Sequence, residues 1–314
     1  AGMSRSEKPL ALESFPFTGF SKTYSADNYV TDSGAGGTAI ACGVKTRNGM
    51  VGMGPDSVAV SSVLEIAYKN GLATGVLCTS ALTDATPASF VAHNVSRGNY
   101  EAIAKDFLRG TADVFIGGGE DHFRKRSDNT DLALKLKEQG YDVIYKIDDL
   151  KSSGSRKIAG FLAKDDMSKA SEGRAGMLPE MTSKAIDVLS RDKDGFFMMV
   201  EGSMIDWGSH ERDFDFAVSE MIDLDNAVRV ARDFAEKNGE TLVVVTADHE
   251  TGGLTLPGGS IKNHTVTGNF NQTGNHTGVM VPVFSYGPGA ERFSGIHENT
   301  FFKNEFINLL GIAQ

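Results

Sequence analysis

Short runs of apolar and β-branched residues alternate along this chain with segments that have the features of helices. Runs of this length and composition are typical of strands that are buried on both faces. The alternation favours an α/β fold, in which a large, mostly parallel central sheet lies between two helical layers as a three-layer αβα sandwich. The expected strands cover residues 74–79, 114–116, 142–145, 196–200, 241–246 and 279–286.

The segments between these runs contain residues that are typical of helix starts and helix ends, so we expect helices there. The strand over 279–286 contains Pro282, which has no N–H to donate, so we expect that strand at or near a sheet edge. Residues 148–176 have a weak pattern and predict a surface excursion, and residues 256–274 predict a long loop. No strand is expected before the first predicted helix, which begins at residue 33. The expected helices cover residues 33–41, 58–69, 88–95, 131–139, 179–190, 223–237 and 300–310.

Charge and composition narrow the classes of partner. The formal net charge is −10 and the pI is near 5.2, which argues against nucleic acid as a main partner because phosphate backbones attract basic surfaces. No apolar run approaches the length of a membrane span, and no signal peptide opens the sequence. Cys42 and Cys78 lie among small or apolar residues, so we expect two buried free thiols rather than a disulfide.

A possible nucleophile lies in the stretch from Tyr29 to Gly43. Thr31, Asp32 and Ser33 are helix-capping types followed by small residues, which predicts a helix start with Ser33 in or near the first turn. The unpaired N–H groups of such a turn attract a phosphate, and a serine there could attack it. The alternative is that Thr31 or Ser33 only caps the helix.

Three places along the chain hold residue types that bind zinc. Glu201 ends an apolar strand, and Asp206 and His210 follow with the spacing of one helical turn. Asp248 and His249 end a second strand, and His276 precedes a third. Alternatives are a surface pair for Asp206 and His210, a capped turn at Asp248, and an exposed loop histidine at His276.

A fourth place combines oxygen ligands with a guanidinium. Asp84 and Thr86 follow the strand over 74–79 and offer the oxygen donors that Mg²⁺ prefers. Arg97 lies in the next predicted helix or at its end, and an arginine can hold two phosphate oxygens at once; the alternative is a surface arginine. Together these groups are the parts of a two-metal phosphoryl-transfer site.

These segments, in this order, resemble those of alkaline phosphatase, and the resemblance runs from about Ser21 to Pro288. Thr31-Asp32-Ser33 with Gly43-Val44-Lys45-Thr46 resembles the nucleophile segment of the family. Asp84-Ala85-Thr86-Pro87 with Ser96-Arg97 resembles its magnesium and phosphate-arginine segment. Three further segments of this chain resemble the family's remaining metal-binding segments. They are Val200-Glu201-Gly202 through Asp206 and His210, Thr246-Ala247-Asp248-His249, and His276-Thr277-Gly278.

The resemblance implies a role for each residue. Ser33 would attack phosphorus and form a phosphoserine, and Arg97 would clamp the phosphate. The implied cofactors are two Zn²⁺ and one Mg²⁺. One zinc would be held by Asp206, His210 and His276, the other by Asp248 and His249, and magnesium by Glu201 and Thr86 directly and by Asp84 through water.

The sequence also departs from the family. The family's first strand ends in a Gly-Asp-Gly-Met-Gly-like motif whose aspartate bridges two metals, and this sequence has no such motif. We therefore expect the first strand to be missing, with weak magnesium and second-zinc binding and poor activity. Trp207 stands where some family members carry a basic residue near the phosphate, so we expect Trp207 to contact the substrate. Because tryptophan has no positive charge, we expect this chain to bind phosphate less tightly than those members do. The short polar stretch 263–274 predicts a reduced surface domain.

Three functions remain open from the sequence. The resemblance favours a phosphomonoesterase with one alkaline phosphatase-like catalytic domain over residues 1–314 and small surface insertions near 148–176 and 256–274. The alternatives are a phosphodiesterase or sulfatase relative on the same scaffold, and a metal- and phosphate-binding protein with impaired turnover. The resemblance further implies a small phosphorylated substrate, a homodimer, and a periplasmic or secreted location.

Overall fold

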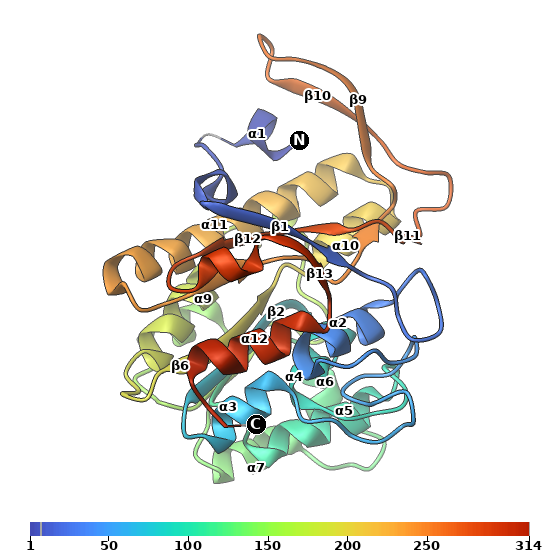
Figure 1. The fold of residues 1–314 in the computed structure, drawn as a ribbon. Helices are drawn as coiled ribbons and strands as arrows, with labels where there is room; N and C mark the ends of the chain where they lie inside the picture. The colour runs from blue at the N-terminus through green and yellow to red at the C-terminus, as the bar shows by residue number, and fades with distance from the viewer. Residues whose placement is uncertain (7, 314) are drawn as a thin grey trace. The chain divides into compact units, whose positions relative to one another are not determined.

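The computed structural model describes residues 1–6 and 8–313 (Figure 1). Its chain falls into two compact units. The first unit comprises Ala1–Thr23, Ser168–Glu180 and Gly202–Glu298. The second unit comprises Tyr24–Met167, Met181–Glu201 and Asn299–Gln314. Each unit has its own sheet.

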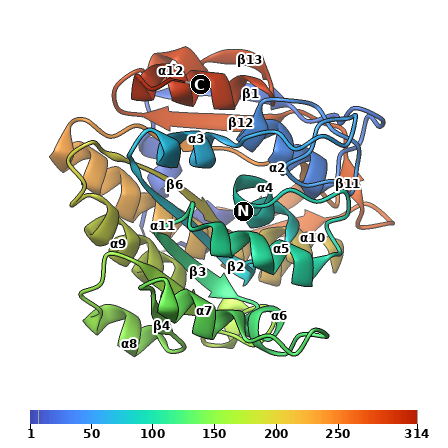
Figure 2. The ribbon, with the colours of Figure 1, turned by 90° about the horizontal axis from the view of Figure 1, so that it is seen from below.

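The second unit contains a five-stranded sheet in which every neighbouring pair is parallel. Its central strands are almost entirely apolar and buried, as expected where helices cover a parallel sheet. The α/β class with a mostly parallel sheet is thereby confirmed (Figure 2). In spatial order the strands are β4 (Asp142–Ile144), β5 (Ile158–Phe161), β3 (Val114–Gly118), β2 (Ala73–Ala81) and β6 (Phe196–Glu201).

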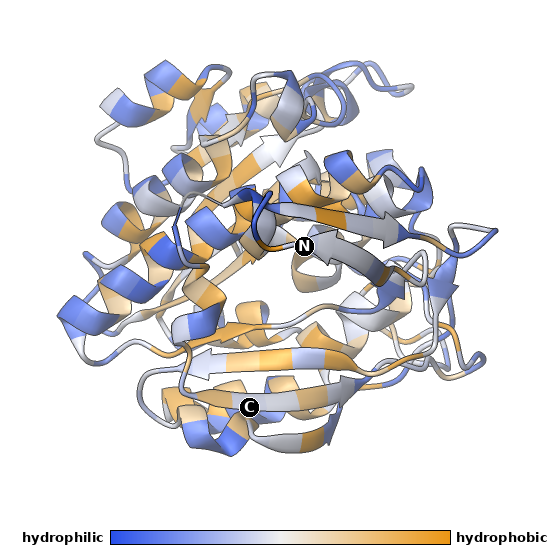
Figure 3. Cartoon of the chain, turned by 90° about the horizontal axis from the view of Figure 1, so that it is seen from above, coloured by the Kyte–Doolittle hydropathy of each residue, from blue (hydrophilic) through white to orange (hydrophobic). Residues whose placement is uncertain are grey.

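Helices α3 and α4 contact β2 and β6, and α2 packs on α4. The main apolar core of this unit contains buried residues of these helices, of the sheet, of further helical segments between residues 103 and 136, and of the last helix. In Figure 3 the helical ribbons change between hydrophobic and hydrophilic colours along their turns, as expected of helices with one buried face. The helices are α2 (Ser33–Cys42), α3 (Val63–Lys69), α4 (Ala85–Val91), α5 (Tyr100–Asp106), η2 (Phe107–Arg109), α6 (Glu120–Arg124), α7 (Leu132–Glu138), α8 (Ile147–Ser152) and α12 (Phe301–Leu310).

The first unit contains a four-stranded mixed sheet in the order β13, β1, β12, β7. These strands are Gly295–Glu298, Phe17–Lys22, Val281–Tyr286 and Val243–Val245. Two short ribbons pair β9 (Thr255–Ser260) with β10 (Thr265–Asn269), and β8 (Glu250–Thr251) with β11 (His276–Thr277). The helical segments are α1 (Gly2–Arg5), η1 (Ala11–Ser14), η3 (Ala170–Glu172), α10 (Met204–His210), α11 (Phe214–Asn238) and η4 (Ala290–Phe293); α9 (Met177–Leu189) begins in this unit.

Three segments have more structure than the sequence predicts. Strand β1 precedes α2, although its mixed composition gives no apolar run. Strand β5 lies within the segment 148–176 that we expected on the surface, yet its four residues are buried between β3 and β4. The expected long loop over 256–274 contains the ribbon of β9 and β10, whose glycines and threonines conceal the strand pattern.

Several expected boundaries are wrong. The helix expected over 58–69 begins at Val63, because Ser62 rather than Asp56 or Ser57 is the cap. The helix expected over 88–95 covers Ala85–Val91, and α11 begins nine residues before Asp223, at Phe214 behind its cap Asp213. Strand β7 is shorter than the expected 241–246, and its residues are only half-buried.

The expected edge position of the strand with Pro282 is also wrong, since β12 lies between β1 and β7. Strand β7 pairs only with Phe284, Ser285 and Tyr286. The Thr246 hydroxyl donates to the Pro282 carbonyl, 3.0 Å away. Proline is tolerated here because the pairing with β7 stops before it reaches that residue.

The expectation about the two thiols is confirmed. Cys42 and Cys78 are buried free thiols, and burial raises the pKa of Cys42 to about 12. In the part of the chain that the structure describes, every helix is too short or too polar to cross a membrane.

Candidate active site

The helix start that carries Ser33 is as predicted. Helix α2 begins at Ser33, and the Asp32 carboxylate caps it by accepting a hydrogen bond from the Ala35 N–H at 2.9 Å. The cap is therefore Asp32, and the alternative in which Thr31 or Ser33 is the capping residue is wrong. Gly34 must lack a side chain because a Cβ there would lie 2.8 Å from the Met50 carbonyl oxygen.

Arg97 lies in the segment that follows α4, beyond the helix in which, or at whose end, we expected it. Its Nη1 donates to Asp32 Oδ2 at 3.2 Å, and its Nη2 donates to Asp84 Oδ1 at 3.1 Å. Burial opposes the charge of Arg97, but Asp84 and Asp32 raise its pKa above the usual value. The guanidinium is thus held, charged and half-buried, beside the start of α2. The sequence did not identify Asp32 as a site residue. An aspartate that only caps a helix cannot be told from the sequence apart from one that also binds a distant arginine.

The predicted magnesium ligands follow or end two neighbouring strands of the parallel sheet. Glu201 ends β6 and pairs in register with Cys78 of β2. Asp84 follows β2 as the N-cap residue of α4, and Thr86 lies in the first turn of that helix. Because β2 and β6 are parallel neighbours, their carboxyl ends meet at one edge of the sheet. Two carboxylates and a hydroxyl form an oxygen donor set that fits Mg²⁺.

In the first unit, α10 brings two predicted zinc ligands together. Asp206 and His210 lie one turn apart, with Asp206 Oδ2 3.3 Å from His210 Nε2. His210 Nδ1 lies 2.8 Å from the Gly274 carbonyl oxygen, which fixes the ring orientation. A histidine held in this way presents Nε2 for coordination.

His276 begins β11, and His249 lies directly before β8, the strand that pairs with β11. His276 pairs with Thr251, two residues after His249. The rings of His249 and His276 stack with centroids 3.6 Å apart, and His276 Nε2 lies 3.1 Å from His210 Nε2. Thr251 donates to Asp206 and lies 3.1 Å from His249 Nδ1. Thr251 was not predicted, because its contacts arise only when β8 pairs with β11.

These donors suit zinc. Ligand atoms of Asp206, His249 and His276 lie within 4.8 Å of one another, and carboxylate oxygen with imidazole nitrogen is a typical zinc set. Asp248 Oδ2 is buried and lies 3.2 Å from His249 Nε2, and no described residue donates a hydrogen bond to it. Asp206, His210 and His276 also lie close together, with pairwise distances of 3.3, 3.1 and 3.5 Å between their ligand atoms.

Trp207 lies next to Asp206 on α10 and is half-buried.

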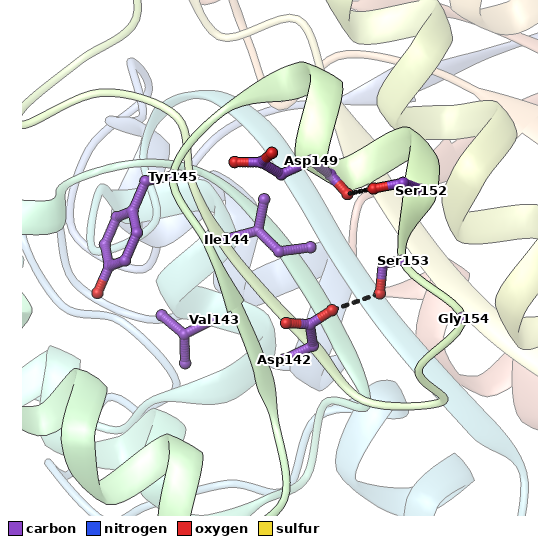
Figure 4. A pocket seen from close by; sticks show the side chains of 8 residues that line it. All are labelled: Asp142, Val143, Ile144, Tyr145, Asp149, Ser152, Ser153 and Gly154. Carbon is purple, nitrogen blue, oxygen red and sulfur yellow. Dashed lines mark hydrogen bonds between the residues drawn. The ribbon is translucent and has the colours of Figure 1, made fainter.

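A separate hollow is lined by β4, α8 and the residues between and after them (Figure 4). There the Ser153 hydroxyl donates to Asp142 at 2.6 Å and the Ser152 hydroxyl donates to the Asp149 carbonyl at 3.0 Å. Its lining residues, 142–145, 149 and 152–154, include none of the predicted site residues.

Comparison with known proteins agrees with the residues described above. The alkaline phosphatase family model matches residues 1–272. Alkaline phosphatase 4 of Bacillus subtilis is 33% identical over 358 residues, covering 90% of this chain and 77% of that protein. The alkaline phosphatase of the Antarctic bacterium TAB5 is 39% identical with a TM-score of 0.93, covering 100% of this chain and 94% of that chain. A variant of the Antarctic enzyme, with the same identity, coverage and TM-score, has Mg bound in its M3 site. The chain therefore belongs to the alkaline phosphatase family.

Proposed function

We propose that this phosphatase hydrolyses phosphate monoesters through a phosphoserine intermediate on Ser33, with the help of zinc and magnesium. The observation that carries the proposal is the contact between Arg97 and Asp32. It fixes a guanidinium beside the first turn of the helix that Ser33 begins. A helix N-terminus and an arginine are two independent ways of binding a phosphate dianion.

In the first step, Ser33 Oγ forms a bond to phosphorus as the bond between phosphorus and the substrate's alcohol oxygen breaks. The hydroxyl proton of Ser33 is lost, and the leaving alcohol oxygen gains a proton. In the second step, water attacks the phosphoserine and the bond from phosphorus to Ser33 Oγ breaks. Ser33 Oγ regains a proton that the attacking water releases, and inorganic phosphate leaves. The Arg97 guanidinium binds two non-bridging oxygens throughout and stabilises the charge on them.

The metal sets follow the resemblance to the family, and the donor types agree with them. We assign Mg²⁺ to the oxygen donors of the second unit and two Zn²⁺ to the aspartates and histidines of the first. When bound, these ions supply Lewis acidity that lowers the pKa of a hydroxyl or a water molecule. The proposed ligands are Asp206, His210 and His276 for one zinc, Asp248 and His249 for the other, and Glu201, Thr86 and Asp84 for magnesium.

The intermediate can be trapped. The zinc- and magnesium-loaded protein is mixed with p-nitrophenyl phosphate, quenched in acid, digested and analysed by mass spectrometry. We expect one phosphoryl group on the peptide that contains Ser33 and none in Ser33→Ala, which keeps the Asp32 cap. Hydrolysis by the parent protein without any phosphopeptide would argue against a covalent mechanism.

Two alternatives are tested in the same preparation. Rates on bis-p-nitrophenyl phosphate or p-nitrophenyl sulfate that exceed the monoester rate would favour a phosphodiesterase or a sulfatase. Phosphate binding without turnover would favour a binding protein. The proposal further takes residues 1–314 as one catalytic domain of a periplasmic or secreted homodimer, and light scattering of the purified protein tests the dimer.

A further inference from the structure

A partly buried histidine outside the proposed metal sets, His93, has a hydrogen-bond acceptor at each ring nitrogen. His93 Nδ1 lies 2.6 Å from the Gly52 carbonyl oxygen, and His93 Nε2 lies 3.0 Å from Glu65 Oε1. A neutral imidazole has only one N–H, so it can satisfy only one of these acceptors. Both bonds form together only when the ring is a doubly protonated imidazolium.

The surroundings support a charged ring. Burial opposes the charge on His93, but the hydrogen bonds to Glu65 and Gly52 raise its pKa above the usual value. Glu65 behaves in the opposite sense: burial opposes its charge, and His93 lowers its pKa. Arg109 lies 2.9 Å from Glu65 Oε1 and also favours the carboxylate. Asp106 Oδ2 accepts the backbone N–H of His93 at 2.9 Å.

The Glu65 carboxylate cannot easily move away from His93. Its second oxygen, Oε2, accepts the Ser62 N–H at 2.9 Å in the capping box that begins α3. Ser62 in turn donates from its hydroxyl to the Phe90 carbonyl of α4 at 2.6 Å. The acceptor for Nε2 is therefore fixed by two helices.

The acceptor for Nδ1 is fixed by close backbone packing. Gly52 has φ +64°, and a Cβ at this position would lie 2.0 Å from the Ala92 carbonyl oxygen and 2.7 Å from His93 Nδ1. The Gly52 carbonyl also accepts the Val60 N–H at 3.0 Å. Only glycine allows the backbone at residue 52 to approach residues 92 and 93 so closely.

From His93, a short antiparallel ladder leads to Arg97. Val51 and Asn94 exchange two backbone hydrogen bonds, at 3.0 and 2.9 Å, and the Arg97 N–H donates to the Gly49 carbonyl at 2.7 Å. The Gly49 N–H donates to Asp32 Oδ2 at 3.0 Å, the same oxygen that accepts from the Arg97 guanidinium. His93 stands at one end of this ladder and Arg97 at the other.

We propose that His93, as an imidazolium clamped between Gly52 and Glu65, is a positioning residue that fixes residues 92–97 against residues 49–52 and so sets the place of the Arg97 guanidinium. The effect on phosphate binding rests on the function proposed above for Arg97. The clamp itself does not depend on that function, because it concerns bonds within one folded unit.

Loss of the proton releases one of the two acceptors. Three charged groups face this ring and its backbone: Glu65 from α3, Arg109 from η2 and Asp106 from α5. Above the raised pKa of His93, the segment keeps its backbone ladder but loses one end of the clamp. The proposal therefore predicts looser placement of Arg97 at alkaline pH.

The first test is spectroscopic. The protein is labelled with ¹⁵N at histidine ring nitrogens, and the His93 signals are assigned by their loss in His93→Gln. We expect both ring nitrogens of His93 to be protonated at pH 7, with deprotonation at a lower pH in Glu65→Gln. A neutral single tautomer at pH 7 would overturn the proposal.

The second test measures the ladder. Amide hydrogen exchange at Arg97 should be faster in His93→Gln than in the parent, on the order of tenfold. Tyr141→Phe is the matched control, because it removes a buried hydrogen bond to the Ala112 carbonyl and leaves the clamp intact. Equal exchange at Arg97 in His93→Gln and the parent, or equal acceleration in Tyr141→Phe, would reduce His93 to a general stabilising residue and overturn the proposal.

The third test uses inorganic phosphate as the probe. Its dissociation constant, measured by calorimetry, should rise on the order of tenfold in His93→Gln and stay unchanged in Tyr141→Phe. KM should rise more than kcat falls. If the parent neither binds nor hydrolyses phosphate compounds, the proposed function fails, and the ring-nitrogen and exchange results still decide the clamp.

Discussion

Arg97 Nη1 lies 3.2 Å from Oδ2 of Asp32, the residue whose other carboxylate oxygen caps the helix that begins at Ser33. One carboxylate therefore holds both the proposed nucleophile's helix and the proposed phosphate-binding cation. A change in either partner is expected to disturb the other through Asp32.

Arg97→Lys should weaken phosphate binding. Lysine keeps the positive charge but cannot donate to two partners in the planar arrangement of a guanidinium. We expect KM for p-nitrophenyl phosphate and the inhibition constant of phosphate to rise on the order of tenfold to a hundredfold. Steady-state kinetics measure both constants. Arg124→Lys, at an exposed ion pair with Glu120, should leave them unchanged; an equal effect there would contradict the assignment.

His276→Ala should lower the zinc content of the protein. Its Nε2 lies 3.1 Å from His210 Nε2 and 3.5 Å from Asp206 Oδ1, so its removal opens the cluster. We expect at least roughly tenfold weaker zinc binding, measured by elemental analysis after dialysis against buffers of fixed free zinc. His264→Asn is the control, because His264 is exposed near the turn of the β9–β10 ribbon and asparagine tolerates its φ of +51°.

Arg174→Met should destabilise the first unit severely. Arg174 is 1% exposed and donates to Glu220, to Asp223 at 2.6 Å and to the Ser168 carbonyl at 2.7 Å. Its loss leaves two buried carboxylates without their cation, which costs about 3–5 kcal/mol. Urea unfolding measures this loss. Arg124→Met, at an exposed ion pair, should cost at most about 1 kcal/mol, and a similar loss in both variants would show that burial of the network has no special effect.

The Glu65–His93 pair should make stability depend on pH in a defined window. The pKa of His93 is raised from 6.5, so its contribution is complete below about pH 6.5 and is lost as pH rises through the folded value. The pKa of Glu65 is lowered from 4.5, so its contribution is complete above about pH 4.5 and is lost as pH falls through the folded value. Both contributions are complete between these limits. The difference in unfolding free energy between the parent and Glu65→Gln should be largest there, and a difference independent of pH would contradict the pairing.

The sequence was most informative where chemistry and local structure coincide. The start of α2 at Ser33 and the one-turn spacing of Asp206 and His210 follow from capping and helical periodicity, which act over a few residues. The parallel sheet followed from the alternation of strands and helices. These are local signals, and they do not depend on which distant segment lies alongside.

The missed features depend on distant partners. Asp32 accepts a hydrogen bond from Arg97, which lies sixty-five residues further along the chain. Thr251 comes close to His276 because their two strands pair. Strand β5, with the sequence Ile-Ala-Gly-Phe, is too short to show a period, and only its place between β3 and β4 makes it a strand. The clamp around His93 joins three segments whose sequences carry no sign of one another.

The two native thiols have a practical consequence. Cys42 and Cys78 are both buried, and burial raises the pKa of each thiol, so neither offers a thiolate to an alkylating reagent under native conditions. A single cysteine introduced at the exposed Ile261, near the turn of the β9–β10 ribbon, would be the preferred target for a fluorophore or spin label. A label can therefore be placed on that ribbon without first removing either native cysteine.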